Sequence, residues 1–400
     1  MEKILTRSRH LFPRQKAHYA ALVATLFICG MIVCAVAVRG QGTGQTVDGR
    51  IAALNQKAPD FPPPGFKATG ITWIDSQPLT LADLHGKVVM IDFWEYTCIN
   101  CVRTFPQNKE WYTRYHKYGF EIIGVHDPEF QIAYDVANVE AAVKRYALPY
   151  PIVVDDYFKI WGAYRNNVWP NRFLIDGNGN VRYELEGEGD DHNFEVLIRQ
   201  LLDEAHPGLA FPQDYTLPVA ENMNAPACGG TPTDEMYVGK WGDRGILENP
   251  DPYHPGVTVN YKLPDKVDDG HAVISGKWET DPNGMIFEGK AQQPEQNSSR
   301  MEMKYHATQV YAVMNVAQGK PERLYILQDG KDLTNDDKGA DVKIDANGHS
   351  YIDVDSSRMY YLAANKEFGN HTLELIPTAP GIEVDSFTFG NSCETTFPHV

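Results

Sequence analysis

The chain has 400 residues, of which 42% are hydrophobic and 22% charged, and its formal net charge is −17. This length suits two globular domains plus an N-terminal extension, and both fractions are ordinary for globular protein. Residues 1–39 hold six basic side chains and one acidic side chain, a surplus of +5, so the rest of the chain carries −22. Such a body repels nucleic acid and anionic lipid headgroups, and we expect no nucleic-acid partner.

The N-terminal residues predict a membrane anchor. Residues 1–16 form a basic leader, which we expect on the cytoplasmic side, and residues 17–38 contain no Asp, Glu, Lys or Arg. A run of this length spans a bilayer as a helix, and the charge asymmetry places the body outside the cytoplasm or in the periplasm. A signal peptide cleaved near Ala35-Val-Ala37 is the alternative, although the apolar run is longer than the usual signal-peptide core. With either an anchor or a cleaved signal peptide, we expect the rest of the chain to be exported.

Residues 39–57 are rich in Gly and Gln and lack a hydrophobic period, which predicts a flexible tether. Alternating strand and helix signals then predict an α/β domain over residues 58–206. Val88–Phe93 is a continuous apolar run, typical of a buried central strand. The predicted helices are Cys98–Gly119, Val136–Tyr146 and Asp191–Ala205, and the other strands are Glu121–His126, Tyr150–Val154 and a hairpin of Asn171–Asp176 with Val181–Glu186.

Cys98 and Cys101 are the most informative residues of the chain. They lie two residues apart on what should be the first turn of a helix, directly after the apolar strand. The N-terminus of a helix stabilises a thiolate, so we expect Cys98 to attack and Cys101, one turn further in, to resolve the mixed disulfide. Asp92 lies on the strand beneath and should accept the Cys101 proton, with a pKa raised by burial. A hydrogen-bonded structural role is the alternative for Asp92.

Other readings of the cysteine pair fit less well. A structural disulfide would close a very small loop and add little stability, and a zinc site would need a second Cys or His pair that the sequence lacks, so no metal is expected. A peroxiredoxin-like antioxidant would have Pro and Thr where Ile91 and Glu95 stand. A copper chaperone of the Sco type would have three residues between its cysteines. His126 ends a strand near the sheet's carboxyl edge and could contact the site, but a hydrogen-bonded structural histidine is the expectation.

Residues 58–205 resemble the thioredoxin-fold domain of the TlpA/ResA-like exported oxidoreductases, and most of all the soluble part of DipZ-type proteins. The matching stretches are Trp73–Lys87, Val88–Pro106, Gly124–Phe130 and Asn167–Asp176. The resemblance implies a cis-proline beside the dithiol at Pro170, with the Trp169 backbone pairing with an extended substrate segment. Trp94 and Thr97 are assigned to the same substrate groove, although family members commonly have Trp where this chain has Thr97.

The same resemblance implies a thiol–disulfide oxidoreductase with protein thiols or disulfides as substrates and no dissociable cofactor. Ile99 and Asn100, between the cysteines, include neither His nor Pro, so we expect moderate thiolate stabilisation, which favours a reductase. Turnover then needs a membrane electron donor of the DsbD/CcdA kind. That donor would be a separate protein, since the sequence lacks the multi-span transporter that DipZ proteins carry.

Residues 207–230 read as a linker, and residues 231–400 predict an all-β sandwich, jelly-roll-like, from short strands separated by turns. This domain resembles the carbohydrate-binding-module-like β domain of DipZ-type proteins, through Asp234–Gly239 and Asp385–Gly390. The resemblance suggests a glycan ligand. The aromatic residues in question are Trp241, Trp278, Tyr253 and Tyr261, and rings on such strands are more often core than sugar-stacking surface.

Cys228 and Cys393 bracket the second domain and would form a structural disulfide, because the ends of a sandwich are often close together. Two independent thiols are the alternative. A different class of function also stays open at this point: a glycan-binding or surface-binding protein that uses the β domain and whose dithiol is incidental.

Overall fold

The computed structural model describes residues 51–61, 70–214, 229–239, 246–251, 253–290, 299–316 and 320–392, which all belong to one compact unit, residues 46–400. The predicted anchor at 17–38, Trp241 and the predicted Cys228–Cys393 disulfide lie outside the described residues. Across the described ranges, no helix is long and apolar enough to cross a membrane.

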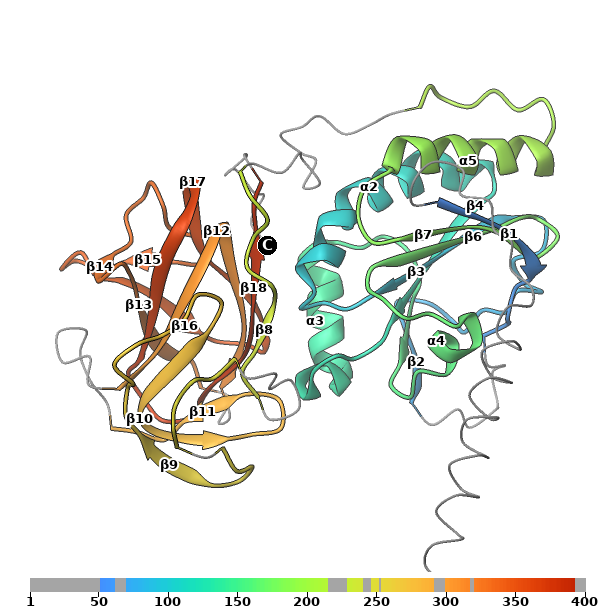
Figure 1. Ribbon diagram of the computed structural model, residues 1–400. Helices are drawn as coiled ribbons and strands as arrows, with labels where there is room; N and C mark the ends of the chain where they lie inside the picture. Colours follow the sequence, from blue (N-terminus) through green and yellow to red (C-terminus); the bar gives the residue numbers. More distant parts are fainter. Residues whose placement is uncertain are drawn as a thin grey trace, which may run out of the picture. The chain divides into compact units, whose positions relative to one another are not determined.

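Residues 51–205 form a three-layer α/β domain (Figure 1). The described strands are β1 (Ile51–Lys57), β2 (Ile71–Ile74), β3 (Val88–Trp94), β4 (Phe120–His126), β5 (Ile152–Asp155), β6 (Asn171–Ile175) and β7 (Asn180–Glu186), in the sheet order β1-β7-β6-β3-β4-β5-β2. The helices are α2 (Ile99–Tyr115), α3 (Val136–Tyr146), α4 (Lys159–Tyr164) and α5 (Asp191–Ala205). Strands β3, β4 and β5 are parallel, and β6 and β7 add to β3 as an antiparallel hairpin. This is the thioredoxin-like fold that the sequence predicts.

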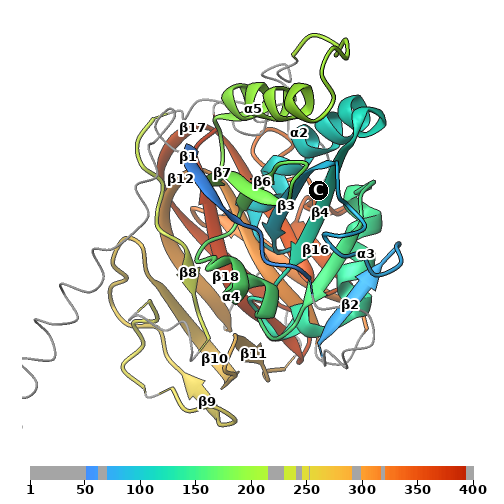
Figure 2. The same ribbon diagram turned by 90° about the vertical axis from the view of Figure 1, so that its right-hand side faces the viewer.

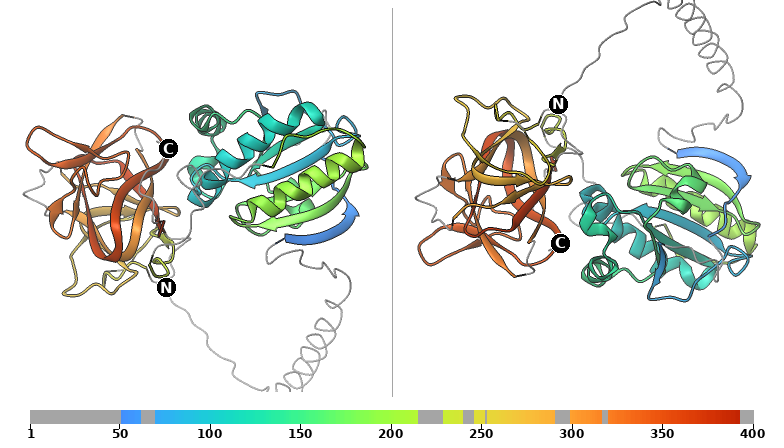
Figure 3. Two further views of the ribbon diagram at one scale, coloured as in Figure 1. Left: turned by 90° about the horizontal axis from the view of Figure 1, so that it is seen from above. Right: turned by 90° about the horizontal axis from the view of Figure 1, so that it is seen from below.

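Strand β3 lies at the centre and is buried on both faces. Met90 and Trp94 face a core that also takes apolar residues of α2, α3 and α5, whereas Ile91 and Phe93 face a second core that includes residues of α4. Since side chains alternate along a strand, Asp92 points to the same side as Met90 and Trp94, towards α2. Helices α2 and α5 lie side by side over that face of the sheet (Figure 3).

Local sequence explains where the elements that carry the site begin and end. Cys98 is the N-cap of α2, in an extended conformation, and its side chain accepts from the backbone N–H of Cys101. A short 3-10 turn follows the helix and ends at Gly119, whose φ of 93° lies in the left-handed region that glycine tolerates. Asp135 caps α3 through its side chain.

The prediction of a tether over 39–57 is wrong for residues 51–57. They form the edge strand β1, which pairs antiparallel with β7. The sequence signal is weak because an edge strand needs only partial burial, and only Ile51 of this strand is fully buried. Two short elements, β2 and α4, were also not predicted.

Residues 236–390 form an all-β domain. Its described strands are β8 (Met236–Tyr237), β9 (Thr258–Tyr261), β10 (Ala272–Thr280), β11 (Met285–Phe287), β12 (Arg300–Val316), β13 (Glu322–Gln328), β14 (Lys331–Asp332), β15 (Lys343–Ile344), β16 (Ser350–Val354), β17 (Arg358–Pro377) and β18 (Ile382–Gly390). Their pairings join them into one continuous sheet, in which the long strands β12 and β17 pair along most of their length. Figure 2 shows β9, β10 and β11 as neighbours at one end of this domain.

The expectation that aromatic residues of this domain belong to its core is confirmed for two of the four. Trp278 and Tyr261 are buried in the main core of the β domain, so neither ring offers a sugar-stacking surface. Tyr253 is half-buried and stacks on Tyr261, with ring centroids 5.3 Å apart.

Candidate active site

Cys98 and Cys101 lie at the N-terminus of α2, directly after the central strand β3. Cys98 is partly exposed, whereas Cys101 is fully buried. Both are thiols, and Cys98 Sγ accepts from the Cys101 backbone N–H at 3.3 Å. One sulfur is therefore open to a substrate and the other is held one helical turn behind it, which is the arrangement that the spacing predicts.

The two thiols differ in how far they are from ionising. A hydrogen bond with Cys101 lowers the pKa of the Cys98 thiol, but burial and the carboxylates of Glu129 and Glu235 raise it, and the net direction is upward. Burial raises the pKa of the Cys101 thiol well above its usual range, and Cys98 and Asp92 raise it further. The helix N-terminus alone thus does not leave a strongly acidic thiol at position 98, and Cys101 needs a base to ionise.

Asp92 is the carboxyl group beneath the dithiol. Its side chain is fully buried, and burial raises its pKa to about 7, although Arg172 and a hydrogen bond from Asn108 act in the opposite direction. Asn108 Nδ2 donates to Asp92 Oδ2 at 2.9 Å, and among the described residues Oδ1 has no hydrogen-bond partner. A carboxyl group that titrates near neutrality beside a thiol can accept and return a proton at working pH.

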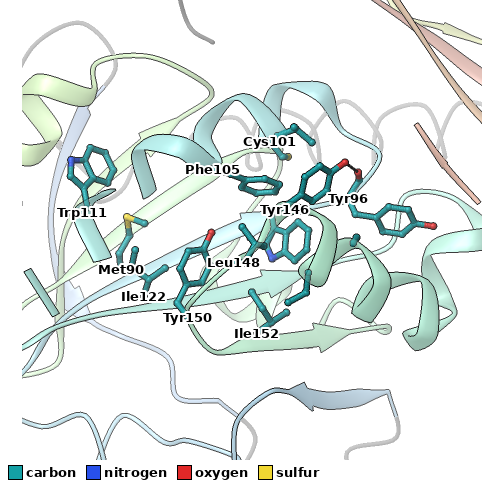
Figure 4. Packing of buried hydrophobic residues seen from close by; sticks show 14 of the residues in the cluster. Met90, Tyr96, Cys101, Phe105, Trp111, Ile122, Tyr146, Leu148, Tyr150 and Ile152 are labelled. Carbon is teal, nitrogen blue, oxygen red and sulfur yellow. Dashed lines mark hydrogen bonds between the residues drawn. The ribbon is translucent and has the colours of Figure 1, made fainter. Parts of the chain in front are cut away.

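The surroundings of Cys101 are largely apolar. Figure 4 shows Phe105, Tyr146 and Tyr150 below it, between α2 and the sheet, and the Tyr146 hydroxyl donates to the Tyr96 carbonyl at 3.1 Å. This packing keeps water from Cys101 and Asp92. It is also the physical cause of their raised pKa values, since burial disfavours the charged forms of both groups.

Arg172 is the buried cation of the site. It lies opposite Asp92 in the antiparallel pairing of β6 with β3, and its guanidinium donates to Asp191 at the start of α5 at 3.0 Å. The rings of Trp111 and Phe194 lie 5.6 and 5.5 Å from the guanidinium. Arg172 therefore stabilises the charged form of Asp92 from a distance while its own charge is neutralised by Asp191.

Replacing Asn108 with leucine should raise the pKa of Asp92 from about 7 by about one unit, because it removes a hydrogen bond to the charged carboxylate, worth roughly 1.5 kcal/mol. The carboxyl carbon-13 shift of Asp92, followed against pH by nuclear magnetic resonance, measures this directly. An unchanged or lowered midpoint would contradict the assigned role of Asn108.

Pro170 and Trp169 lie beside the end of the central strand. The Trp169–Pro170 peptide bond is cis, as the resemblance implies, and Pro170 is buried directly before β6. Trp169 is half-buried and packs on Trp161, with ring centroids 4.5 Å apart. Their predicted part in presenting a substrate segment stays a prediction.

The assignment of Trp94 and Thr97 to a substrate groove is wrong. Trp94 is fully buried and packs edge-on against Phe105 and His126. Thr97 is 2% exposed, and its backbone N–H donates to Glu95 Oε2 at 2.7 Å, as does its hydroxyl. The sequence placed both residues next to Cys98, but their side chains point into the protein.

His126 also differs from its prediction. It is fully buried, yet among the described residues neither ring nitrogen has a hydrogen-bond partner. Its Nε2 lies 3.7 Å from Oε1 of the buried Glu95, and its ring stacks on Tyr96 with centroids 5.7 Å apart. Glu95 and His126 thus form a second buried polar pair below the loop that carries Cys98.

Sequence reasoning missed Asn108 and Arg172. A signal existed for Asn108, which lies seven residues after Cys101 and therefore on the same face of α2, within an otherwise apolar stripe. Arg172 had only the signal of a charged residue in a buried strand, and its pairing with Asp92 depends on the register of β6 against β3.

Each of the two domains matches a known protein family. Residues 54–184 match the AhpC/TSA family, and residues 233–390 match the family described as thioredoxin-like C-terminal domain. Protein DipZ of Mycobacterium bovis is 33% identical over 328 residues, which are 80% of this chain and 42% of DipZ. The chain thus spans less than half the length of that relative.

A second relative matches the first domain alone. The thiol-disulfide oxidoreductase ResA of Bacillus cereus is 31% identical over 148 residues, which are 37% of this chain and 78% of ResA. A solved structure of a thiol:disulfide interchange protein of the thioredoxin family from Chlorobium tepidum is 22% identical with a TM-score of 0.31, and the match covers 38% of this chain and 98% of that chain.

Proposed function

Because the chain belongs to the ResA family of thiol-disulfide oxidoreductases, we propose that it exchanges disulfides with protein substrates through Cys98 and Cys101. The observation that carries this proposal is the position of the pair. A partly exposed thiol caps α2, and a buried thiol lies one turn behind it. The charge of Asp92, whose own pKa is raised to about 7, raises the pKa of that buried thiol.

In the first step the Cys98 thiolate attacks one sulfur of a substrate disulfide. A bond forms between that sulfur and Cys98 Sγ, the substrate S–S bond breaks, and the released substrate thiolate takes a proton from solvent. In the second step Asp92 accepts the Cys101 proton, and the Cys101 thiolate attacks Cys98 Sγ. The mixed disulfide breaks, and the second substrate sulfur leaves as a thiolate that takes up a proton, so the substrate is released as a dithiol. Asp92 then returns its proton to solvent, and the protein holds the two-electron-oxidised Cys98–Cys101 disulfide.

We further propose that the chain acts as a reductase and needs no dissociable cofactor. The Cys98–Cys101 disulfide then has to be reduced again, and a membrane electron donor of the DsbD/CcdA kind would supply the electrons. A membrane electron donor requires both domains to lie outside the cytoplasm. We propose that residues 17–38 anchor them there. A glycan ligand of a sandwich-like second domain stays a prediction from resemblance.

The reduction potential of the Cys98–Cys101 pair tests both the exchange and its direction. Equilibration of the protein in dithiothreitol or glutathione buffers should give a potential of about −250 mV or lower, as in other reducing exchange proteins. A potential near −120 mV would keep the exchange chemistry but reverse its direction, since such a pair oxidises its substrates. No reversible exchange at all would reject the proposed function.

A further inference from the structure

Tyr237 of the β domain and Cys98 pack against the same apolar core cluster, and Tyr237 joins two carboxyl groups there. It lies on the two-residue strand β8, which pairs with β18. Its hydroxyl contacts Glu129 Oε1 and lies 2.8 Å from Glu235 Oε2, while Thr388 donates to the other Glu235 oxygen at 2.8 Å. We call Glu129, Tyr237 and Glu235 the acidic rim. The first residue comes from the loop after β4, and the other two come from the β domain.

Further contacts hold the two sides of the rim together. The Phe130 ring stacks on Tyr237, with centroids 5.8 Å apart and planes 24° from parallel. The backbone N–H of Gln131 donates to Asn283 Oδ1 at 3.4 Å. These contacts bring residues of the β domain beside the segment that follows β4.

The rim acts on Cys98. The carboxylates of Glu129 and Glu235 both raise the pKa of its thiol, which means that negative charge on them disfavours the attacking thiolate. Arg103, on the second turn of α2, interacts favourably with the Cys98 thiolate, but it is paired with Glu188 at 3.4 Å, which offsets its charge. Glu95 is fully buried, and its Oε1 lies 3.7 Å from Nε2 of the buried His126, away from the exposed side of Cys98. The field at the exposed side of Cys98 is therefore negative on balance.

The rim also holds protons in a pH-dependent way. A tyrosine hydroxyl has one hydrogen and can donate to only one of the two carboxyl groups, so the second contact requires a carboxyl proton. Burial, Glu235 and Glu95 raise the pKa of Glu129 to about 8. Glu129 is therefore mostly neutral at pH 7 and gains its charge between about pH 7 and 9, next to Cys98.

We propose that the acidic rim is a specificity determinant of the redox site, contributed in part by the β domain, and that it selects substrates with a basic residue beside the reacting cysteine. A cationic group of the substrate would offset the negative field that opposes the Cys98 thiolate and would also be attracted as it approaches. The inference deepens the proposed function and rests on it.

Two peptides test the selection. They are identical disulfide peptides except that Lys or Glu flanks the reacting cysteine, and the second-order rate of their reduction by the pre-reduced full-length protein is measured at low salt. We expect the Lys peptide to react about tenfold faster, and we expect Glu235→Gln to cut this ratio about threefold. Glu367→Gln, which changes an exposed carboxylate elsewhere on the same domain, should leave the ratio unchanged.

The pH dependence provides a second arm. The ratio of the two rates should rise between pH 7 and 9 in the parent protein, as Glu129 gains its charge, and should stay flat in Glu129→Gln. Because both peptides use the same Cys98 thiolate, its own ionisation cancels in the ratio. A parent ratio near one, or a ratio that neither variant changes, would overturn the selection. Failure to reduce either peptide would instead reject the underlying exchange function.

Discussion

Replacing Cys101 with serine should stop turnover and leave substrates attached to Cys98. The first attack needs only Cys98, which is the partly exposed thiol at the helix cap. The second attack needs the thiolate of Cys101, which lies one turn behind Cys98. A serine hydroxyl in its place does not ionise near neutral pH and cannot attack the mixed disulfide. The mixed disulfide should therefore accumulate, and disulfide reduction should fall by at least about a thousandfold. Non-reducing electrophoresis with mass spectrometry detects the adduct.

The matched control is Cys98→Ser, which removes the attacking sulfur and keeps the buried one. It should be equally inactive but should form no adduct, because Cys101 is fully buried. If instead Cys98→Ser formed the adducts and Cys101→Ser formed none, the assigned order of the two cysteines would be reversed. Substrates recovered from Cys101→Ser would also show directly whether basic residues flank their reacting cysteines.

The chemical core of the site was predictable from the sequence because it is local. Cys98, Cys101 and Asp92 lie within ten residues, and an apolar strand followed by a helix fixes their mutual position. The elements of the first domain were predictable for a similar reason, since α3 and α5 follow the apolar periods of their sequences and α3 also begins at the capping residue Asp135.

The partners of this core were not predictable, because they depend on register and packing. Arg172 meets Asp92 only through the pairing of β6 with β3, and Tyr237 reaches Glu129 from a different domain. Trp94, by contrast, was given a role in the site that its position in the structure rules out. It was assigned to the substrate groove together with Thr97, but β3 is buried on both faces, so this ring lies in the core.

Replacing Asp92 with asparagine should stabilise the protein at pH 8 and leave its stability almost unchanged at pH 4. The pKa of Asp92 rises from 3.8 to about 7 on folding, so the native state binds more protons than the unfolded state between these values. Ionised Asp92 therefore lowers the free energy of unfolding as pH rises from about 4, and the loss is complete above pH 7. Removing the charge should recover up to about 4 kcal/mol at pH 8, measured by urea denaturation.

Asp176 provides a control of opposite sign. Burial raises its pKa, but hydrogen bonds from Asn180 and Asn178 outweigh this and lower it overall. Asp176→Asn should therefore destabilise the protein at pH 8 and lose this effect as pH falls towards 3.

The same Asp92→Asn variant should resolve mixed disulfides about a hundredfold more slowly near pH 7, since Cys101 would then lose its proton acceptor. Stability and rate thus change in opposite directions, which a structural role of Asp92 does not predict. A structural carboxylate would lose stability on replacement and would leave the resolution step intact. A stabilised variant with a slow second step is the specific signature of a buried charge retained for proton transfer. A variant that is destabilised at pH 8 and resolves at the parent rate would show that Asp92 is a structural residue and that the Cys101 proton leaves by another route.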